Sequence, residues 1–150
     1  MPLPAVRPHA PDAAERDTTP ESLDGIRIVV VDDETDSRQA IAAVLEEWGA
    51  QVMSASNARD GPAIIDGKPT DVVISDIAMP VEDGYTFIRE LRARPSGDPA
   101  RLRALALTAY AGLEEPGRPR AAGYDGHLAK PADVRDLVTA VWRLMKRRPS

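Results

Sequence analysis

The stretch Ile26-Arg27-Ile28-Val29-Val30-Val31 is a nearly continuous apolar run, and Asp32-Asp33-Glu34 follow it directly. A run of this kind is typical of a β-strand that is buried on both faces, as the strands of a parallel sheet are. The sequence therefore predicts a strand over 26–31 whose carboxyl end carries acidic side chains.

Other apolar segments alternate with helical patterns along the rest of the chain. Further strands are expected at 51–55, 71–75, 102–107 and 126–129. Helices are expected at about 35–48, 57–66, 84–94, 113–122 and 133–146. Strands and helices that alternate in this way build a parallel sheet with helices on both faces. The predicted fold class is α/β, a doubly wound five-stranded parallel sheet.

Two of the expected helices contain residues that interrupt a helix. Gly61-Pro62 lies inside the segment 57–66 and disfavours its first turns, because proline has no backbone N–H to donate. In the segment 113–122, Pro119 follows Gly117, and an interior proline costs a helix about 3 kcal/mol. This second helix is expected to be short, to begin late or to be irregular.

The composition narrows the class of protein. Hydrophobic residues are 43% of the 150 residues and aromatic residues only 4%, so a single domain with an aliphatic core is expected. The absence of cysteine excludes a disulfide scaffold, a thiol nucleophile and a thiolate zinc site. A net charge of −5 at pH 7 argues against a partner that is a nucleic acid. Without a membrane-length apolar run or an export signal, we expect a cytoplasmic protein with no direct membrane insertion.

The first 24 residues differ in composition from the rest of the chain. They hold five prolines, and Leu23 is the only large apolar residue between Ala10 and Asp24. Such a segment buries too little apolar surface to offset the entropy lost on ordering. We therefore expect a disordered, proline-rich tail or linker over 1–24 and one folded domain over 25–148.

Polar side chains follow the carboxyl ends of four of the expected strands. Asp32 and Asp33 follow the first strand and Asp76 the third, whereas Thr108 and Lys130 follow the fourth and fifth. Binding sites of open parallel sheets form outside the carboxyl ends of the strands. Taken singly, such residues have ordinary structural roles in helix caps, turns and solvated surfaces. Their presence at one edge of one sheet favours a common site.

The combination fits a site for a phosphoryl group. Asp32, Asp33 and Asp76 cannot all stay ionised at close range unless a cation offsets their repulsion, and Mg²⁺ prefers such oxygen ligands. Lys130 would neutralise phosphoryl oxygens and Thr108 would donate a hydrogen bond to them. No histidine, cysteine or serine base follows these strands. Asp76 is the candidate nucleophile, because a carboxylate needs no deprotonation.

Residues 25–146 resemble a receiver domain of the two-component response-regulator family. The stretches that carry the resemblance are Ile28-Val29-Val30-Val31-Asp32-Asp33-Glu34, Asp76-Ile77-Ala78-Met79-Pro80, Asp83-Gly84, Thr108-Ala109 and Lys130-Pro131. The resemblance implies a flavodoxin-like sheet with the strand order 2-1-3-4-5. It extends to chemotaxis-type single-domain regulators and to the terminal receivers of hybrid histidine kinases.

The resemblance also implies a role for each residue of the site. Asp76 would be the phosphoryl acceptor. Asp33, Asp76 and the backbone carbonyl of Ala78 would bind Mg²⁺, with Asp32 acting mainly through water. Lys130 would pair with the phosphoryl group.

The implied switch departs from the family pattern at one position. Thr108 would be the hydroxyl that moves to hydrogen-bond the phosphoryl group. The family usually has an aromatic residue three positions before the lysine, and here that residue is His127. Its imidazole either makes the same inward rotation or is a half-exposed strand residue, and both interpretations stay open. Tyr110, two residues after Thr108, would share or replace this role.

The implied function is that of a phosphoacceptor in a two-component phosphorelay, which takes a phosphoryl group from a phosphohistidine and changes conformation to signal. Its partner would be a histidine kinase or a histidine phosphotransfer protein, and a phosphorylation-linked dimer is compatible with this. The chain would have no separate substrate and would catalyse only its own aspartyl phosphorylation and dephosphorylation. Because it ends soon after the last expected helix, no output domain is expected after it. A stand-alone regulator and a terminal hybrid-kinase receiver both stay open.

Three other functions use a similar fold or similar residues. A haloacid-dehalogenase-like phosphatase also uses Asp, Mg²⁺, Thr and Lys, but it places its nucleophile after the first strand with a second Asp two residues later. Here the two carboxylates, Asp32 and Asp33, are adjacent. A flavodoxin-like flavin binder is disfavoured because the acidic first loop would repel a phosphate. An interaction module that is not phosphorylated is disfavoured because every residue of the site is present.

Overall fold

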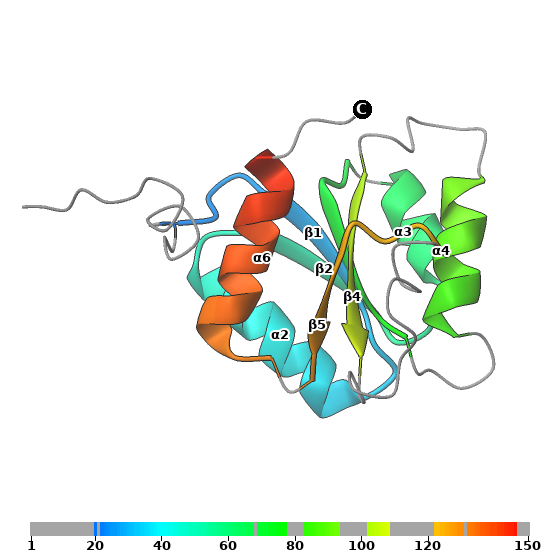
Figure 1. Ribbon diagram of the computed structural model, residues 1–150, viewed down its shortest axis with the longest axis horizontal. Helices are drawn as coiled ribbons and strands as arrows, with labels where there is room; N and C mark the ends of the chain where they lie inside the picture. Colours follow the sequence, from blue (N-terminus) through cyan, green and yellow to red (C-terminus); the bar gives the residue numbers. More distant parts are fainter. Residues whose placement is uncertain are drawn as a thin grey trace, which may run out of the picture.

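The protein is described by a computed structural model at residues 20, 22–67, 69–77, 83–93, 102–108, 122–130 and 132–146. Five strands form one parallel sheet in the order β2-β1-β3-β4-β5 (Figure 1). The strands are β1 (Arg27–Val31), β2 (Gln51–Ala55), β3 (Val72–Asp76), β4 (Arg103–Thr108) and β5 (Gly126–Ala129). The predicted α/β fold class and the strand order 2-1-3-4-5 are confirmed.

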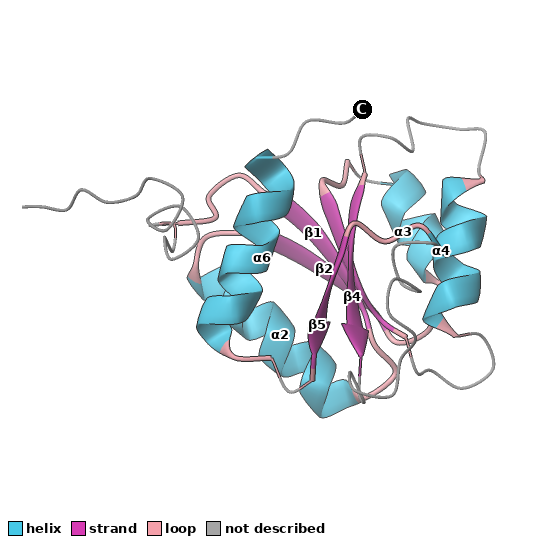
Figure 2. Cartoon of the chain, in the orientation of Figure 1, coloured by secondary structure: helices cyan, strands magenta, loops and turns pink. Residues whose placement is uncertain are grey.

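Helices cover both faces of this sheet. They are α2 (Thr35–Glu47), α3 (Gly61–Gly67), α4 (Gly84–Arg92) and α6 (Val134–Lys146). The helices α2 and α6 lie on one face, and α3 and α4 lie on the other (Figure 2). Within the described parts of the chain, no helix is long and apolar enough to cross a membrane. The irregular helix expected at 113–122 lies outside the described residues except at its last position.

The position of β1 inside the sheet explains why its sequence is apolar at nearly every position. It pairs in parallel with β2 on one side and with β3 on the other. Successive side chains of a strand point to opposite faces. Ile28 and Val30 therefore enter the core under α2 and α6, whereas Val29 and Val31 enter the core on the face of α3 and α4. Both faces are buried, so neither leaves room for a polar side chain.

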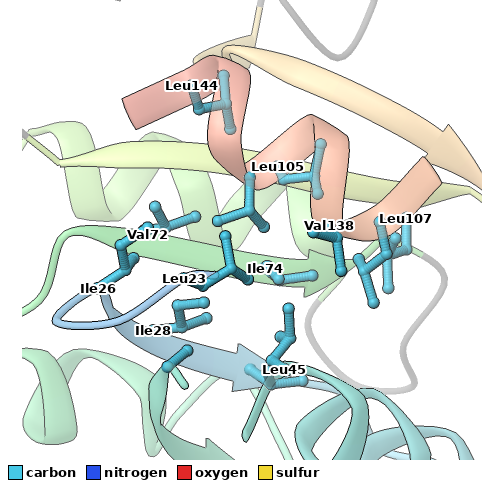
Figure 3. Close-up of a cluster of buried hydrophobic side chains, with 14 residues drawn as sticks. Leu23, Ile26, Ile28, Leu45, Val72, Ile74, Leu105, Leu107, Val138 and Leu144 are labelled. Carbon is cyan, nitrogen blue, oxygen red and sulfur yellow. The ribbon is translucent and has the colours of Figure 1, made fainter. Parts of the chain in front are cut away.

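The buried residues of the core under α2 and α6 are all aliphatic, and the partly buried side chains of Trp48 and Trp142 pack against them. Figure 3 shows Leu23, Ile28, Ile74, Leu105 and Val138 meeting between the sheet and these helices. The opposite core contains fully buried aromatic side chains, among them Phe87 and Tyr124. Among the described residues, the fully buried side chains are thus aliphatic on one face of the sheet and include aromatic rings on the other.

The packed chain begins upstream of the expected domain start at Gly25. Leu23 is 0% exposed, and its backbone N–H donates to the carbonyl of Trp48. Trp48 follows α2, so this hydrogen bond ties the approach to β1 to the end of that helix. Residues 1–19 and 21 lie outside the described residues, and the expected disordered tail stays a prediction.

The helix α3 begins later than the sequence pattern predicts. The expected segment 57–66 starts with a turn in which the Asn57 side chain accepts a hydrogen bond from the backbone N–H of Asp60 at 2.9 Å. The helix then begins at Gly61, which places Pro62 in the first turn. A proline is tolerated there because the first N–H groups of a helix have no partner within the helix. The Gly61-Pro62 pair, which disfavours helical turns before it, therefore marks the residue at which α3 begins.

Candidate functional site

The carboxyl ends of four strands bring the expected polar residues to one edge of the sheet. Asp32 follows β1, and Asp76 is the last residue of β3. Thr108 is the last residue of β4 and is in register with Ala129, the residue before Lys130. The four strands are β1, β3, β4 and β5, which are neighbours in this order, so the side chains at their ends converge.

Three carboxylates form a cluster at this edge. Asp32, Asp33 and Asp76 each offer a carboxylate oxygen, and these oxygens lie within 4.8 Å of one another. Asp32 is 0% exposed and Asp76 is 5% exposed, whereas Asp33 is exposed. Carboxylates at this range disfavour one another's ionised form, and burial adds to the cost. Oxygen donors of this kind suit a hard divalent cation such as Mg²⁺, and the cluster has the composition that such an ion requires.

Asp32 is held by the loop and the first turn that begin α2. Its Oδ1 accepts from the backbone N–H of Glu34 at 2.9 Å, and its Oδ2 accepts from the Ser37 hydroxyl at 2.8 Å. The Arg38 guanidinium donates to the Asp32 backbone carbonyl at 2.9 Å. We did not predict Ser37 or Arg38 as part of the site. The sequence could have indicated Ser37, because a helix that begins at Thr35 places Ser37 in its first turn beside the end of β1.

Lys130 bridges the two buried carboxylates. Its Nζ lies 3.2 Å from Asp32 Oδ2 and 3.3 Å from Asp76 Oδ2. The more exposed Glu34 carboxylate is 3.9 Å from the same nitrogen. Burial works to lower the pKa of Lys130, but the charges of Asp76 and Asp32 outweigh it, so the pKa is raised. Lys130 therefore stays an ammonium and offsets part of the charge of the cluster.

The Thr108 hydroxyl is buried and only weakly engaged. Thr108 is 1% exposed, and its Oγ1 donates to the carbonyl of Leu128 on β5 at 3.4 Å, which is a long hydrogen bond. The backbone N–H of Lys130 donates to the Thr108 carbonyl at 2.7 Å. The Thr108 backbone is thus held next to Lys130. The Thr108 hydroxyl, in contrast, makes only a weak hydrogen bond, which costs little free energy to exchange for another.

The remaining predicted residues have different outcomes. His127 is an exposed residue of β5, in register with Ala106 of β4. This position matches the second of the two interpretations left open for it and does not test the rotation. Ala78 and Tyr110 lie outside the described residues, so the carbonyl ligand and the second switch residue stay predictions.

Gly84, part of the Asp83-Gly84 stretch that carries the family resemblance, lies directly against Asp76. A Cβ atom on Gly84 would lie 2.7 Å from the backbone oxygen of Asp76 and 2.7 Å from the Cα of Ile77. Backbone atoms cannot yield easily to such a contact, so only glycine fits. Asp83 caps the helix that follows, since its side chain accepts from the backbone N–H of Thr86 at 2.9 Å. The Asp83-Gly84 pair therefore sets α4 directly against the end of β3.

Comparison with known proteins identifies the family. A sequence model of the response regulator receiver domain matches residues 28–142, and the chain belongs to this family. Membership supports a phosphoacceptor role in two-component signalling, with histidine kinases or phosphotransfer proteins as the kind of partner that the family implies.

Individual relatives span different kinds of protein. The chain is 36% identical over 121 residues to an uncharacterized 14.6 kDa protein in the sodA1 3′ region of Leptolyngbya boryana, covering 81% of this chain and 91% of that protein. It is 29% identical over 131 residues to hybrid signal transduction histidine kinase D of Dictyostelium discoideum, covering 83% of this chain and 8% of the kinase. It is 30% identical over 122 residues to the virulence transcriptional regulatory protein PhoP of Salmonella typhimurium LT2, covering 81% of this chain and 53% of PhoP.

Solved structures show the same fold. The chemotaxis protein CheY4 of Vibrio cholerae is 28% identical with a TM-score of 0.72, covering 79% of this chain and 98% of CheY4. A response regulator receiver domain protein from Clostridium thermocellum is 30% identical with a TM-score of 0.73, covering 81% of this chain and 95% of that chain. The chain thus spans nearly all of these receiver structures, but about half of PhoP and a small part of the hybrid kinase. The activities of PhoP and of the hybrid kinase as whole proteins belong to those longer chains.

Proposed function

We propose that this protein is a phosphoacceptor of a two-component phosphorelay and that Asp76 takes a phosphoryl group from a phosphohistidine of a histidine kinase or histidine phosphotransfer protein. The observation that carries the proposal is the position of Asp76. Its carboxylate lies in a buried acidic cluster, 3.3 Å from the Lys130 ammonium, in a chain of the receiver family.

The transfer step needs little from the protein beyond placement. A carboxylate oxygen of Asp76 attacks the phosphorus, and the bond between phosphorus and the histidine nitrogen breaks. The bonding pair goes to the imidazole nitrogen, which takes up a proton, and the product on this chain is an aspartyl phosphate. Since the attacking carboxylate is already ionised, no base is required. Most of the rate then comes from holding the reacting groups in line and from offsetting charge.

Asp33, Asp76 and the carbonyl of Ala78 would hold Mg²⁺, and Asp32 would act on it mainly through water. The closeness of the three carboxylates, within 4.8 Å, supports this ligand set. When bound, the ion supplies positive charge that offsets the carboxylates and the phosphoryl oxygens. Asp32 is already occupied by Glu34 and Ser37 through hydrogen bonds, which suits a residue that is held in place rather than one that moves.

Lys130 and Thr108 would respond to the new group. Lys130 Nζ already lies within reach of Asp76 Oδ2 and would pair with the phosphoryl oxygens that replace this carboxylate charge. The long hydrogen bond from Thr108 to Leu128 would be given up when the hydroxyl turns to the phosphoryl group. His127 and Tyr110 would follow this movement and change the surface beside β5, and a phosphorylation-linked dimer is one readout that such a change could drive.

The proposed substrate, location, partners and domain bounds rest on the amino-acid sequence. The chain has no separate substrate, it acts in the cytoplasm, and its partners are proteins rather than nucleic acid or a lipid bilayer. Its receiver domain spans 25–148, with Leu23 packed in the same core, after a proline-rich tail. The phosphatase alternative has no observation in its favour, because the match over 28–142 is to receiver domains.

The test is incubation with acetyl phosphate and Mg²⁺, followed by intact-mass measurement. The wild-type protein should gain one phosphoryl group, which alkali or hydroxylamine removes, and Asp76→Asn should gain none. Omission of Mg²⁺ should prevent the gain in the wild type. Equal labelling of Asp76→Asn and the wild type would overturn the proposal.

A further inference from the structure

Tyr124 is a buried residue that the proposed chemistry does not use. It precedes β5, is 2% exposed, and packs in the core on the face of α3 and α4. Its hydroxyl donates to the backbone carbonyl of Gly84, the first residue of α4, at 2.9 Å. This hydrogen bond joins residues 40 positions apart in the sequence. A buried hydroxyl that reaches the start of a helix fixes where that helix begins.

The start of α4 is in turn pressed against the phosphoacceptor. The backbone N–H of Gly84 donates to the carbonyl of Ile77 at 2.8 Å. A Cβ on Gly84 would meet the Asp76 oxygen at 2.7 Å and the Tyr124 hydroxyl at 2.9 Å. One tightly packed group is therefore formed by the Tyr124 hydroxyl, the Gly84 backbone and the Asp76 carbonyl. A displacement of the Tyr124 hydroxyl would displace the Asp76 carbonyl as well.

Ser75 ties the same group together from inside β3. It is 0% exposed, and its hydroxyl donates to the Asp76 carbonyl at 3.1 Å. The Ser75 side chain is also a hydrogen-bonding neighbour of the Tyr124 hydroxyl. Burial is the main cause that raises the pKa of Tyr124, with the nearby charges of Asp76 and Asp83 adding to it. The phenol therefore stays protonated and able to donate.

The position of Tyr124 is itself fixed by the other end of α4. Arg92, in the last turn of this helix, donates to the carbonyl of Gly123 at 3.0 Å and to the Asp125 carboxylate at 2.9 Å. Asp125 also accepts from the backbone N–H of Ala104 at the start of β4, at 2.8 Å. The residues on either side of Tyr124 are thus anchored to α4 and β4, far along the helix from Asp76.

We propose that Tyr124 is a positioning residue for phosphorylation, whose hydroxyl holds the start of α4 and thereby the backbone of Asp76 where the carboxylate meets the incoming phosphorus. The inference rests on the proposed function, because it takes Asp76 as the acceptor. The physical ground is the steep dependence of a transfer rate on alignment, since a displacement of about 1 Å costs a reaction up to roughly 100-fold.

The test compares Tyr124→Phe with the wild type in the full chain. Acetyl phosphate with saturating Mg²⁺ is the donor, and the rate is measured well below the melting temperature of every variant. Tyr124→Phe keeps the ring in the core and removes only the hydroxyl. Its phosphorylation should be slower by roughly tenfold, with the label still on Asp76. Ser75→Ala should slow the reaction in the same direction, and it decides the question if Tyr124→Phe does not fold.

Asp71→Asn is the matched control, because it removes hydrogen bonds to Arg27 at the opposite end of the sheet and contacts nothing in the site. It should lose stability and keep the wild-type rate. If folded Tyr124→Phe is phosphorylated at the wild-type rate, or if Asp71→Asn is slowed equally, the positioning role is wrong. A wild-type protein that takes up no phosphoryl group on Asp76 overturns the proposed function instead, which separates the two failures.

Discussion

Lys130 Nζ lies 3.2 Å from Asp32 Oδ2, although the two residues are 98 positions apart in the sequence. Asp32 follows β1 and Lys130 follows β5, and two strands, β3 and β4, separate these in the sheet. The long lysine side chain reaches from the end of β5 to contact Asp32 and also Asp76, which ends β3. The ion pair therefore places a positive charge within the acidic cluster.

Removal of the lysine charge should separate metal binding from the response to phosphorylation. Lys130→Ala keeps all three carboxylates, so the affinity for Mg²⁺ should stay near that of the wild type. The phosphorylated form, however, lacks the cation that pairs with the new group. We expect the changes in backbone chemical shifts on phosphorylation to shrink toward the immediate surroundings of Asp76. Wild-type changes across β4 and β5 in Lys130→Ala would contradict the role given to this residue.

Removal of one charge from the cluster should stabilise the metal-free protein. In Asp76→Asn the remaining carboxylates, Asp32 and Asp33, face one like charge fewer, while Lys130 keeps its partner Asp32. We expect the free energy of unfolding in EDTA to rise by on the order of 1 kcal/mol, the scale of the interaction between two unit charges about 4 Å apart in water. Thermal unfolding measures this, and an equal or lower melting temperature in the variant counts against a repulsive cluster.

Mg²⁺ should stabilise the folded chain through the exposed carboxylate of Asp33. An ion that binds only the folded state raises the melting temperature by mass action. Millimolar Mg²⁺ should raise the melting temperature of the wild type, and Asp33→Ala should lose most of this rise. In EDTA, Asp33→Ala should melt no lower than the wild type, because it too removes a charge from the cluster. Glu34→Gln is the matched control, because it removes the next exposed carboxylate but none of the three in the cluster. If Glu34→Gln loses the response and Asp33→Ala keeps it, the ligand set is misassigned.

The ion pair between Arg27 and Asp71, at the other end of the sheet, should make stability depend on pH. Asp71 Oδ2 accepts from Arg27 Nε at 3.0 Å and from the Arg27 backbone N–H at 2.9 Å. Burial works to raise the pKa of the Asp71 carboxyl, but the hydrogen bonds and charge of Arg27 outweigh it, so the pKa is lowered. A carboxyl with a lowered folded-state pKa stabilises above its unfolded pKa of about 4, and the benefit is lost as the pH falls through the folded value.

Asp71→Asn should accordingly melt lower than the wild type at pH 7, by roughly 2–4 °C for a partly exposed pair in a domain of this size. The difference should shrink as the pH falls below about 4, where the wild-type carboxylate also becomes protonated. Thermal unfolding of both proteins from pH 7 downward measures this difference in melting temperature. A difference that is constant over this range would show that lost packing, and not charge, causes the destabilisation.

The strands and most of the site could be predicted because one physical constraint determines both. A strand covered on both faces must be largely apolar, as β1 is, and the acidic residues that follow its apolar run mark its carboxyl end. Asp32 is predicted in this way, and Asp76, Thr108 and Lys130 are predicted because they stand where the other expected strands end. The predicted bounds of β2 and β5 coincide with those in the structure.

Features that depend on distant partners could not be predicted. Leu23 is a single large apolar residue in a proline-rich segment, and only its packing against buried residues of α2, α6 and the sheet shows that it belongs to the core. In the sequence, Tyr124 is one more apolar residue before a strand. Only the structure shows that its hydroxyl donates to the Gly84 carbonyl. The direction of the Thr108 hydroxyl likewise depends on the Leu128 carbonyl of another strand.

The central claim is that Asp76 carries the phosphoryl group, and chemical mapping of the modified residue tests it most directly. After reaction with acetyl phosphate and Mg²⁺, borohydride reduces an aspartyl phosphate to homoserine, which peptide mass spectrometry locates in the sequence. We expect homoserine at position 76 in the wild type and at no position in Asp76→Asn. Homoserine at Asp32, Asp33 or Asp83 in the wild type, or a phosphate on serine or threonine with position 76 unmodified, would contradict it.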